Sequence, residues 1–260
     1  RRTSFSPNIK ERRDYSCALY DSQGETIAMG DHMPVHLGAM PASVAEAIRT
    51  GPLEPGDVVI LNDPFRGGTH LPDITSVSGV FLDPTEPPAW YVATRAHHSD
   101  VGGMSPGSMP LAREIYQEGL RIPPVKLFRR GRLDADLFEL ILANVRTPDE
   151  RRGDIGAQIA AHRVGERRLL AAAGKYGRAE LDRRSAELQD YTERLLRARL
   201  AEIPAGTYAF EDFLDDDGIT DRPIRIHCSL TISGAGAVVD FTASDPQVSG
   251  GVNANRAVTV

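Results

Sequence analysis

Histidine and aspartate side chains gather in two short blocks of this sequence, residues 62–73 and 95–103. Their potential metal ligands are Asp63, His70, Asp73, His97, His98 and Asp100. Imidazole and carboxylate groups together suit a borderline divalent metal such as Zn, Mn or Fe. Glycines and prolines flank both blocks, so we expect loops that present these groups to solvent. The two blocks therefore predict a metal site.

The first block places His70 and Asp73 three residues apart in a Gly-Thr-His-Leu-Pro-Asp turn. Pro72 and the glycines fix a bend that can turn both side chains the same way, so these two are the first predicted ligands. Asp63 is a further candidate ligand, although Asn-Asp-Pro is also a common turn opening. The alternative for the histidines is a role in capping loops, in which they bond to nearby backbone.

His97 and His98 follow an expected strand, and adjacent residues of a strand point to opposite faces. At most one of them should therefore face the metal, unless the strand has already ended. We favour His98 as the ligand. His97 or Asp100 would then be its outer hydrogen-bond partner, which ligating imidazoles usually need.

Three other side chains are candidates for the surroundings of the metal. His32 and His36 have the spacing of one helix face, but Pro34 lies between them, so a loop that lines the pocket is favoured. Glu118 is either a general base or a salt-bridge partner of Arg121, and spacing alone favours the salt bridge.

Short apolar runs and turn signals predict strands, then helices, then strands again. The expected strands are residues 15–20, 26–29, 57–61, 74–82, 90–95, 208–213, 224–232 and 238–243. The expected helices are residues 40–50, 134–144, 155–173 and 179–201. This order favours an α+β fold with a mixed or antiparallel sheet, central helices and a short β-meander. We expect a metal-site-bearing core over residues 1–204 and a β-rich segment over residues 205–260.

The composition narrows the class of protein. A net charge of −6 over 260 residues argues against nucleic-acid binding, which usually needs a basic surface. No apolar run approaches the length of a membrane span. Two cysteines, Cys17 and Cys228, provide no disulfide framework, so we expect a reducing, cytoplasmic setting. No glycine-rich loop is followed by Lys-Ser or Lys-Thr, which argues against an ATP site of the P-loop type.

A series of short phrases resembles the hydantoinase B / 5-oxoprolinase family, in order along the whole chain. They include Asn-Ile-Lys-Glu-Arg-Arg-Asp (8–14), Pro-Val-His-Leu-Gly (34–38), Asn-Asp-Pro (62–64), Gly-Gly-Thr-His-Leu-Pro-Asp (67–73), His-His (97–98), Asp-Val-Gly-Gly (100–103), Glu-Gly-Leu-Arg-Ile-Pro-Pro (118–124) and Asn-Val-Arg (144–146). Members are usually about twice as long, and this chain resembles their N-terminal half. Its start at Arg1 and its apolar end also suggest a piece of a longer protein.

The resemblance implies a subunit of an ATP-dependent enzyme that opens cyclic amides such as 5-oxoproline or hydantoins. It implies a divalent metal held by His70, Asp73 and His98, with Asp63 as a further ligand, and proton transfer by Glu118, His36 or Asp100. It also implies a hetero-oligomer, in which a hydantoinase A-type subunit or domain binds ATP and performs the phosphorylation.

Two other functions stay open at this point. The family also supplies subunits of acetone and acetophenone carboxylases, so the substrate can be a ketone rather than a cyclic amide. A non-catalytic scaffold is the third possibility, with a structural metal and the charged helix 179–201 as an interaction surface. A structural site would be closed to solvent ligands, whereas a catalytic site keeps a position open.

Overall fold

The computed structural model describes residues 1–30 and 33–259, so His32 lies outside the described residues. It divides into two compact units. The first consists of Arg1–Pro110, Glu114–Leu181 and Ala254–Val260, and the second of Leu111–Arg113 and Asp182–Asn253. The division thus falls inside a long helix, α6 (Arg178–Ala201), whereas the sequence suggested a division after residue 204.

The first unit is built on a seven-stranded sheet with the order β2-β1-β5-β4-β3-β6-β7. The strands are β1 (Tyr15–Tyr20), β2 (Thr26–Met29), β3 (Val58–Leu61), β4 (Asp73–Val80), β5 (Trp90–His97), β6 (Val125–Arg129) and β7 (Arg132–Leu133). All neighbouring strands are antiparallel. This arrangement confirms the predicted α+β class and makes the main sheet antiparallel.

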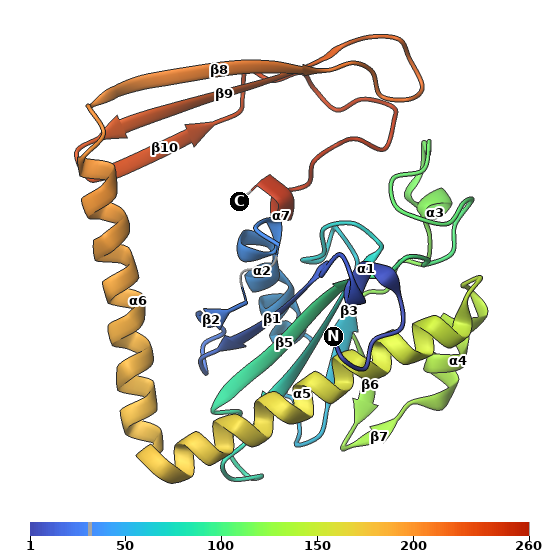
Figure 1. Ribbon diagram of the computed structural model, residues 1–260, viewed down its shortest axis with the longest axis vertical. Coiled ribbons are helices and arrows are strands. Elements are labelled where there is room, and N and C mark those ends of the chain that lie inside the picture. Colours follow the sequence, from blue (N-terminus) through green and yellow to red (C-terminus); the bar gives the residue numbers. More distant parts are fainter. Residues whose placement is uncertain (31–32, 260) are drawn as a thin grey trace. The chain divides into compact units, whose positions relative to one another are not determined.

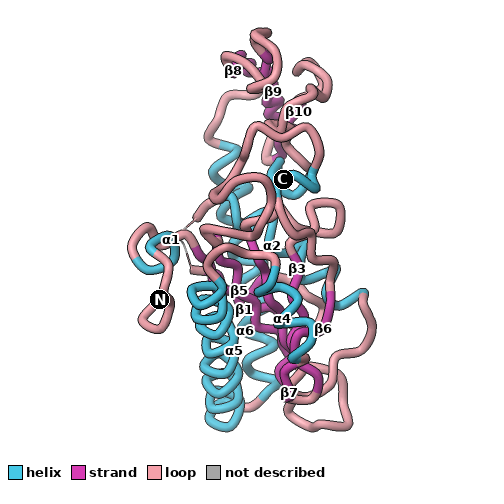
Figure 2. The backbone as a smooth tube through the Cα atoms, turned by 90° about the vertical axis from the view of Figure 1, so that its right-hand side faces the viewer, coloured by secondary structure: helices cyan, strands magenta, loops and turns pink. Residues whose placement is uncertain are grey.

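Helices cover both faces of this sheet (Figures 1 and 2). Helix α2 (Val35–Arg49) packs on one face, and α5 (Pro148–Tyr176) crosses the other with α4 (Ala135–Ala143) beside it. Three short helices complete the unit: α1 (Pro7–Lys10), α3 (Ile115–Glu118) and α7 (Arg256–Thr259). We call the two sides of the sheet the α2 face and the α5 face.

Strand β3 shows why both faces are covered. Its four residues are all buried and all aliphatic, which is the pattern of a strand between two layers. Val58 and Ile60 join the apolar cluster of α4 and α5, whereas Val59 and Leu61 join that of α2. The period of two along the strand thus places successive side chains in two different cores.

The second unit contains a separate three-stranded antiparallel sheet with the order β10-β9-β8. Its strands are β8 (Gly206–Leu214), β9 (Ile224–Ser233) and β10 (Gly236–Asp240), which confirms the predicted β-meander. Among the described residues, no helix is both long enough and apolar enough to cross a membrane.

Candidate metal centre

Asp73 and His97 face each other across two neighbouring strands. Asp73 is the first residue of β4 and His97 the last of β5, and the antiparallel register pairs them directly. Directly opposed side chains on one face of a sheet lie close together. Here Nδ1 of His97 lies 3.1 Å from Oδ1 of Asp73. The strand register therefore builds half of the site.

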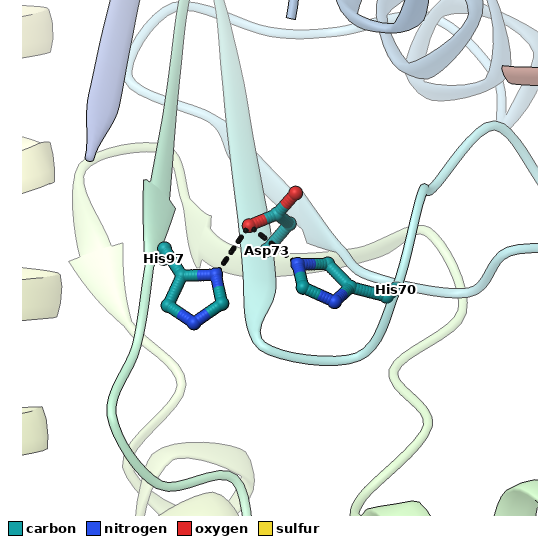
Figure 3. Close-up of side chains that lie close together, drawn as sticks. All are labelled: His70, Asp73 and His97. Atoms are coloured by element: carbon teal, nitrogen blue, oxygen red, sulfur yellow. Dashed lines mark hydrogen bonds and ion pairs between the residues drawn. The ribbon is translucent and has the colours of Figure 1, made fainter. Parts of the chain in front are cut away.

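His70 joins the same carboxylate oxygen from the loop that precedes β4. Its Nε2 lies 3.1 Å from Oδ1 of Asp73, while the Asp73 amide donates a hydrogen bond to the His70 carbonyl. The predicted turn therefore does direct both side chains the same way. Figure 3 shows the two imidazoles on either side of Asp73, with ring centroids 4.9 Å apart.

The other oxygen of Asp73 is held from the side of the α2 helix. Thr69 donates a hydrogen bond of 2.6 Å to Oδ2, and Nε2 of His36 lies 3.7 Å from the same oxygen. His36 is buried in the first turn of α2, and its Nδ1 is 2.9 Å from the Ser16 hydroxyl. His36 is thus part of the centre, on a helix rather than on the expected loop, because Pro34 is compatible with a helix start.

The loop that carries His70 is fixed by contacts along its length. The Asn62 side chain donates to the carbonyls of Leu71 and Leu120, and the Asn255 side chain donates to those of Gly68 and Thr69. Gly68 can only be a glycine, because a Cβ there would lie 2.4 Å from the Asn62 carbonyl oxygen. Such a well-anchored loop presents a ligand in one orientation.

The histidines control the charge of Asp73. Burial alone would raise the pKa of its carboxyl, but hydrogen bonds from His36, His70 and His97 lower that pKa well below its usual value. Burial likewise disfavours the charged form of His70, yet the nearby Asp73 carboxylate raises the net pKa of the imidazole. The centre is therefore anionic at Asp73 near neutral pH.

Exposure increases from Asp73 towards His70. The Asp73 side chain is 5% exposed, that of His97 13% and that of His70 32%. Glu118, at the end of α3, is half-buried, and this burial raises the pKa of its carboxyl, while the charge of His70 acts to lower it. The centre is therefore partly open, and the Glu118 carboxyl is close enough to interact with the charge of His70. Such an arrangement is suited to reacting with a small molecule.

His70, Asp73 and His97 have the donor set of a metal centre. One ligand atom from each lies within 4.8 Å of the other two, and within the described part of the chain no other trio of His, Cys, Asp or Glu is grouped this way. Bonds of about 2.0–2.2 Å bring neighbouring ligand atoms of one metal to roughly 3–4 Å apart. Two imidazoles and one carboxylate thus fit Zn, Mn or Fe with small shifts, and leave further coordination positions for water or substrate.

The sequence analysis favoured His98 over His97 as the ligand, but the structure places His98 on the opposite face of the sheet. Its Nε2 lies 3.1 Å from Oε1 of Gln158 on α5, and the side chain is fully buried. Burial and the charge of Arg151 lower the pKa of His98 to about 4. The reason for the exchange is that β5 extends to His97 and so directs that residue to the α2 face.

Asp63 also lies outside the cluster. Its Oδ1 accepts a hydrogen bond from the Phe65 amide at 3.0 Å, and its Oδ2 lies 3.8 Å from Nε of Arg121. This geometry matches the turn-opening role of an Asn-Asp-Pro sequence rather than ligation.

Asp100 is engaged elsewhere too. Its carboxylate accepts hydrogen bonds from the Gly102 amide and from the backbone and guanidinium of Arg146. Burial opposes ionisation, but these hydrogen bonds lower the net pKa of Asp100. A carboxylate stabilised in this way is a poor proton carrier, so the structure gives Asp100 the role of fixing the turn after His98.

The fold and the site thus define an antiparallel α+β unit in which His and Asp side chains from two strand ends and the preceding loop converge. The chain belongs to the hydantoinase B/oxoprolinase family, whose model matches residues 1–260.

Two relatives and two solved structures set the level of similarity. The beta subunit of a caprolactamase from Pseudomonas jessenii is 38% identical over 95% of this chain and 42% of that subunit. A 5-oxoprolinase from Saccharomyces cerevisiae is 35% identical over 100% of this chain and 21% of that protein. The chain thus spans less than half of these relatives.

The solved structures agree with the fold. The ATP-dependent caprolactamase from P. jessenii matches with a TM-score of 0.88 and 34% identity, over 95% of this chain and 42% of that one. Acetone carboxylase, in a nucleotide-free structure, matches with a TM-score of 0.84 and 22% identity, over 92% of this chain and 34% of that one. The second likeness concerns the fold alone.

Proposed function

We propose that this chain forms the metal-binding part of a subunit of an ATP-dependent hydrolase that opens cyclic amides. The observation that carries the proposal is the convergence of His70 and His97 on one oxygen of Asp73, each at 3.1 Å. The caprolactamase beta subunit and the 5-oxoprolinase support the reaction class, because caprolactam and 5-oxoproline are both cyclic amides.

The three cluster residues would hold the metal, and their neighbours would orient them. Thr69 and His36 occupy Oδ2 of Asp73. Oδ1 already faces the imidazoles of His70 and His97, so it is the oxygen available as a metal ligand. Binding would replace the hydrogen bonds from His70 and His97 to Asp73, and it requires both imidazoles to be neutral. When bound, a divalent metal supplies Lewis-acid polarisation of a carbonyl and a more acidic bound water.

Glu118 is the residue we assign to proton transfer. Its carboxyl has a raised pKa through burial and interacts with the charge of His70. A general acid or base works best when its pKa approaches the working pH, and a raised pKa moves a carboxyl in that direction. His36 is assigned to orientation instead, because both of its ring nitrogens already face partners, Ser16 and Asp73.

The phosphoryl chemistry is assigned to a partner. The sequence has no glycine-rich phosphate loop followed by lysine, so we expect ATP to bind a hydantoinase A-type subunit or domain. The name of the caprolactamase relative, a beta subunit, supports a hetero-oligomer. Two free cysteines, Cys17 and Cys228, support a reducing, cytoplasmic location.

Metal content tests the assignment directly. His70→Ala removes the most exposed ligand, and we expect the purified variant to lose the bound metal that the unaltered chain retains. His227→Ala, in β9 of the second unit, is the matched control and should keep full metal content. Equal metal content in all three proteins, measured by elemental analysis, would remove the basis for the site.

Activity with the partner then separates the candidate reactions. The full-length protein with its hydantoinase A-type partner and ATP should open a lactam or hydantoin ring. ATP-dependent incorporation of bicarbonate into a ketone, without ring opening, would instead identify a carboxylase. Metal binding with no exchangeable solvent ligand and neither activity would identify a scaffold.

A further inference from the structure

A fully buried arginine, Arg95, lies beneath the candidate centre on the α2 face of the sheet. It is 0% exposed and comes two residues before His97 on β5, so both side chains point to the same face. Burying a guanidinium is costly unless its hydrogen bonds are made. Yet its Nη1 has no hydrogen-bond partner among the described residues. A cation retained at this cost calls for a reason other than packing.

The guanidinium contacts the elements that carry the ligands. Its Nε donates to the Thr75 hydroxyl at 2.8 Å, and Thr75 follows Asp73 by two residues on β4. Its Nη2 donates to the Ser43 hydroxyl at 2.7 Å, and Ser43 belongs to α2, the helix of His36. One buried side chain thus ties together the strand of His97, the strand of Asp73 and the helix of His36.

Ser43 extends this connection to the fourth element. Its hydroxyl donates at 2.5 Å to the carbonyl of Gly67, in the loop that leads to His70. A Cβ at Gly67 would lie 2.6 Å from the Ala42 carbonyl oxygen, so the loop and α2 are already at closest approach here. Strand β1 is the other neighbour of β5, and its Ser16 is paired with Arg95 in the strand register. The Ser16 hydroxyl lies 2.9 Å from Nδ1 of His36.

We propose that Arg95 is a positioning residue that sets the mutual geometry of His36, His70, Asp73 and His97 and thereby the metal affinity. The inference rests on the proposed function in one respect, that the cluster binds a metal. The planar fork of arginine is required, because Nε and Nη2 must reach Thr75 and Ser43 at the same time, whereas lysine offers a single point charge. Losing such an outer contact of a metal site typically lowers affinity about 10–100-fold.

Arg95→Lys and Ser43→Ala test the proposal, with Mn²⁺ and Zn²⁺ titrated into the full chain by calorimetry. Arg95→Lys should weaken metal binding about 10–100-fold although the positive charge is kept. Ser43→Ala leaves the arginine in place and should weaken binding by a smaller factor. Unchanged metal affinity in Arg95→Lys would show that the positive charge alone matters. Lowered thermal stability with unchanged affinity would show a purely structural residue, and either result overturns the proposal.

A metal-free measurement separates this inference from the proposed function. Ring nitrogen resonances of the histidines, recorded by NMR without metal, should shift for His36, His70 and His97 in Arg95→Lys. His162, buried on the α5 face, is the internal reference and should not shift. If the unaltered chain binds no metal but the three rings shift together, the proposed function fails and the positioning role holds. Unchanged ring signals in both variants overturn the positioning role itself.

Discussion

The two faces of the β4–β5 pair both carry histidines, but the histidines have different surroundings and different properties. On the α2 face, His70 and His97 surround an ionised, buried Asp73, and His70 itself is partly exposed. On the α5 face, both ring nitrogens of His162 bond to the hydroxyls of Ser76 and Ser78, at 2.8 and 2.7 Å. Burial lowers the pKa of His162 to about 4, whereas the pKa of His70 is raised. A carboxylate and access to solvent, rather than the histidines themselves, distinguish a reactive centre from a structural polar cluster.

Helix α5 explains why the second cluster is closed. Gln158 and His162 are four residues apart on one side of the helix, so both point into the sheet. The Gln158 side-chain NH₂ donates a hydrogen bond of 3.0 Å to the Ile74 carbonyl, and its Oε1 lies 3.1 Å from Nε2 of His98. Both ring nitrogens of His162 and Nε2 of His98 thus have partners, although Nδ1 of His98 has none among the described residues. A neutral imidazole is less costly to bury than a charged one.

The strongest test of the comparison replaces each of the two adjacent histidines, His97 and His98, by alanine in turn. His97→Ala removes a proposed ligand and should lower metal affinity more than about 100-fold, beyond the effect of losing an outer partner. His98→Ala should leave metal affinity within a small factor and instead lower the free energy of unfolding by about 2–4 kcal/mol, because it leaves a cavity and an unpaired Gln158 oxygen.

Calorimetric metal titration and urea unfolding, run on both variants, provide the two readouts. The comparison between the faces is wrong if His98→Ala is the variant that loses metal.

Glu118 sharpens the comparison, because the open face has a half-buried carboxyl near its histidines. Glu118→Gln keeps size and hydrogen bonding but cannot carry the proton, so turnover of a lactam should fall about 100-fold. Metal content should be unchanged, because Glu118 lies outside the ligand trio. Steady-state kinetics with the ATP-binding partner present measures the effect, with Glu114→Gln, the cap of α3, as the neighbouring control. Equal turnover in both variants contradicts the assignment.

The closed face should reveal itself through pH. His162 has a folded-state pKa of about 4 against an ordinary value of 6.5, so the unfolded chain takes up the proton first. Its contribution to stability is therefore complete above pH 6.5 and is lost as the pH falls towards 4. The free energy of unfolding of the metal-free chain should decrease by about 3 kcal/mol over this window from this residue.

Urea unfolding between pH 7.5 and 4.5 in the presence of a chelator measures this slope. His162→Gln should be less stable at neutral pH but should lose less stability on acidification. His70 has the opposite sign, since its raised pKa gives a contribution that is lost as the pH rises through that value. An unchanged slope in His162→Gln would show that His162 is not buried in a neutral state.

The sequence by itself determined the class of the fold and two residues of the cluster, His70 and Asp73. Alternating and continuous apolar runs predicted the strands of both sheets except β6 and β7, and the turn ending in Asp73 predicted that His70 and Asp73 point the same way. The alternation rule also predicted that only one of His97 and His98 would face the site. These features depend on neighbouring residues, whose geometry a short stretch of chain fixes.

Only the tertiary structure decided which histidine that would be. The strand continues two residues past its expected end, from 95 to 97, so His97 lies on the same face as Arg95 and pairs with Asp73, whereas His98 contacts Gln158 on the α5 face. The same holds for His36 and Arg95, which reach the centre from a helix and from the middle of a strand through Ser16, Ser43 and Thr75. Such contacts join residues far apart in sequence, and no local pattern records them, because they arise when the layers pack.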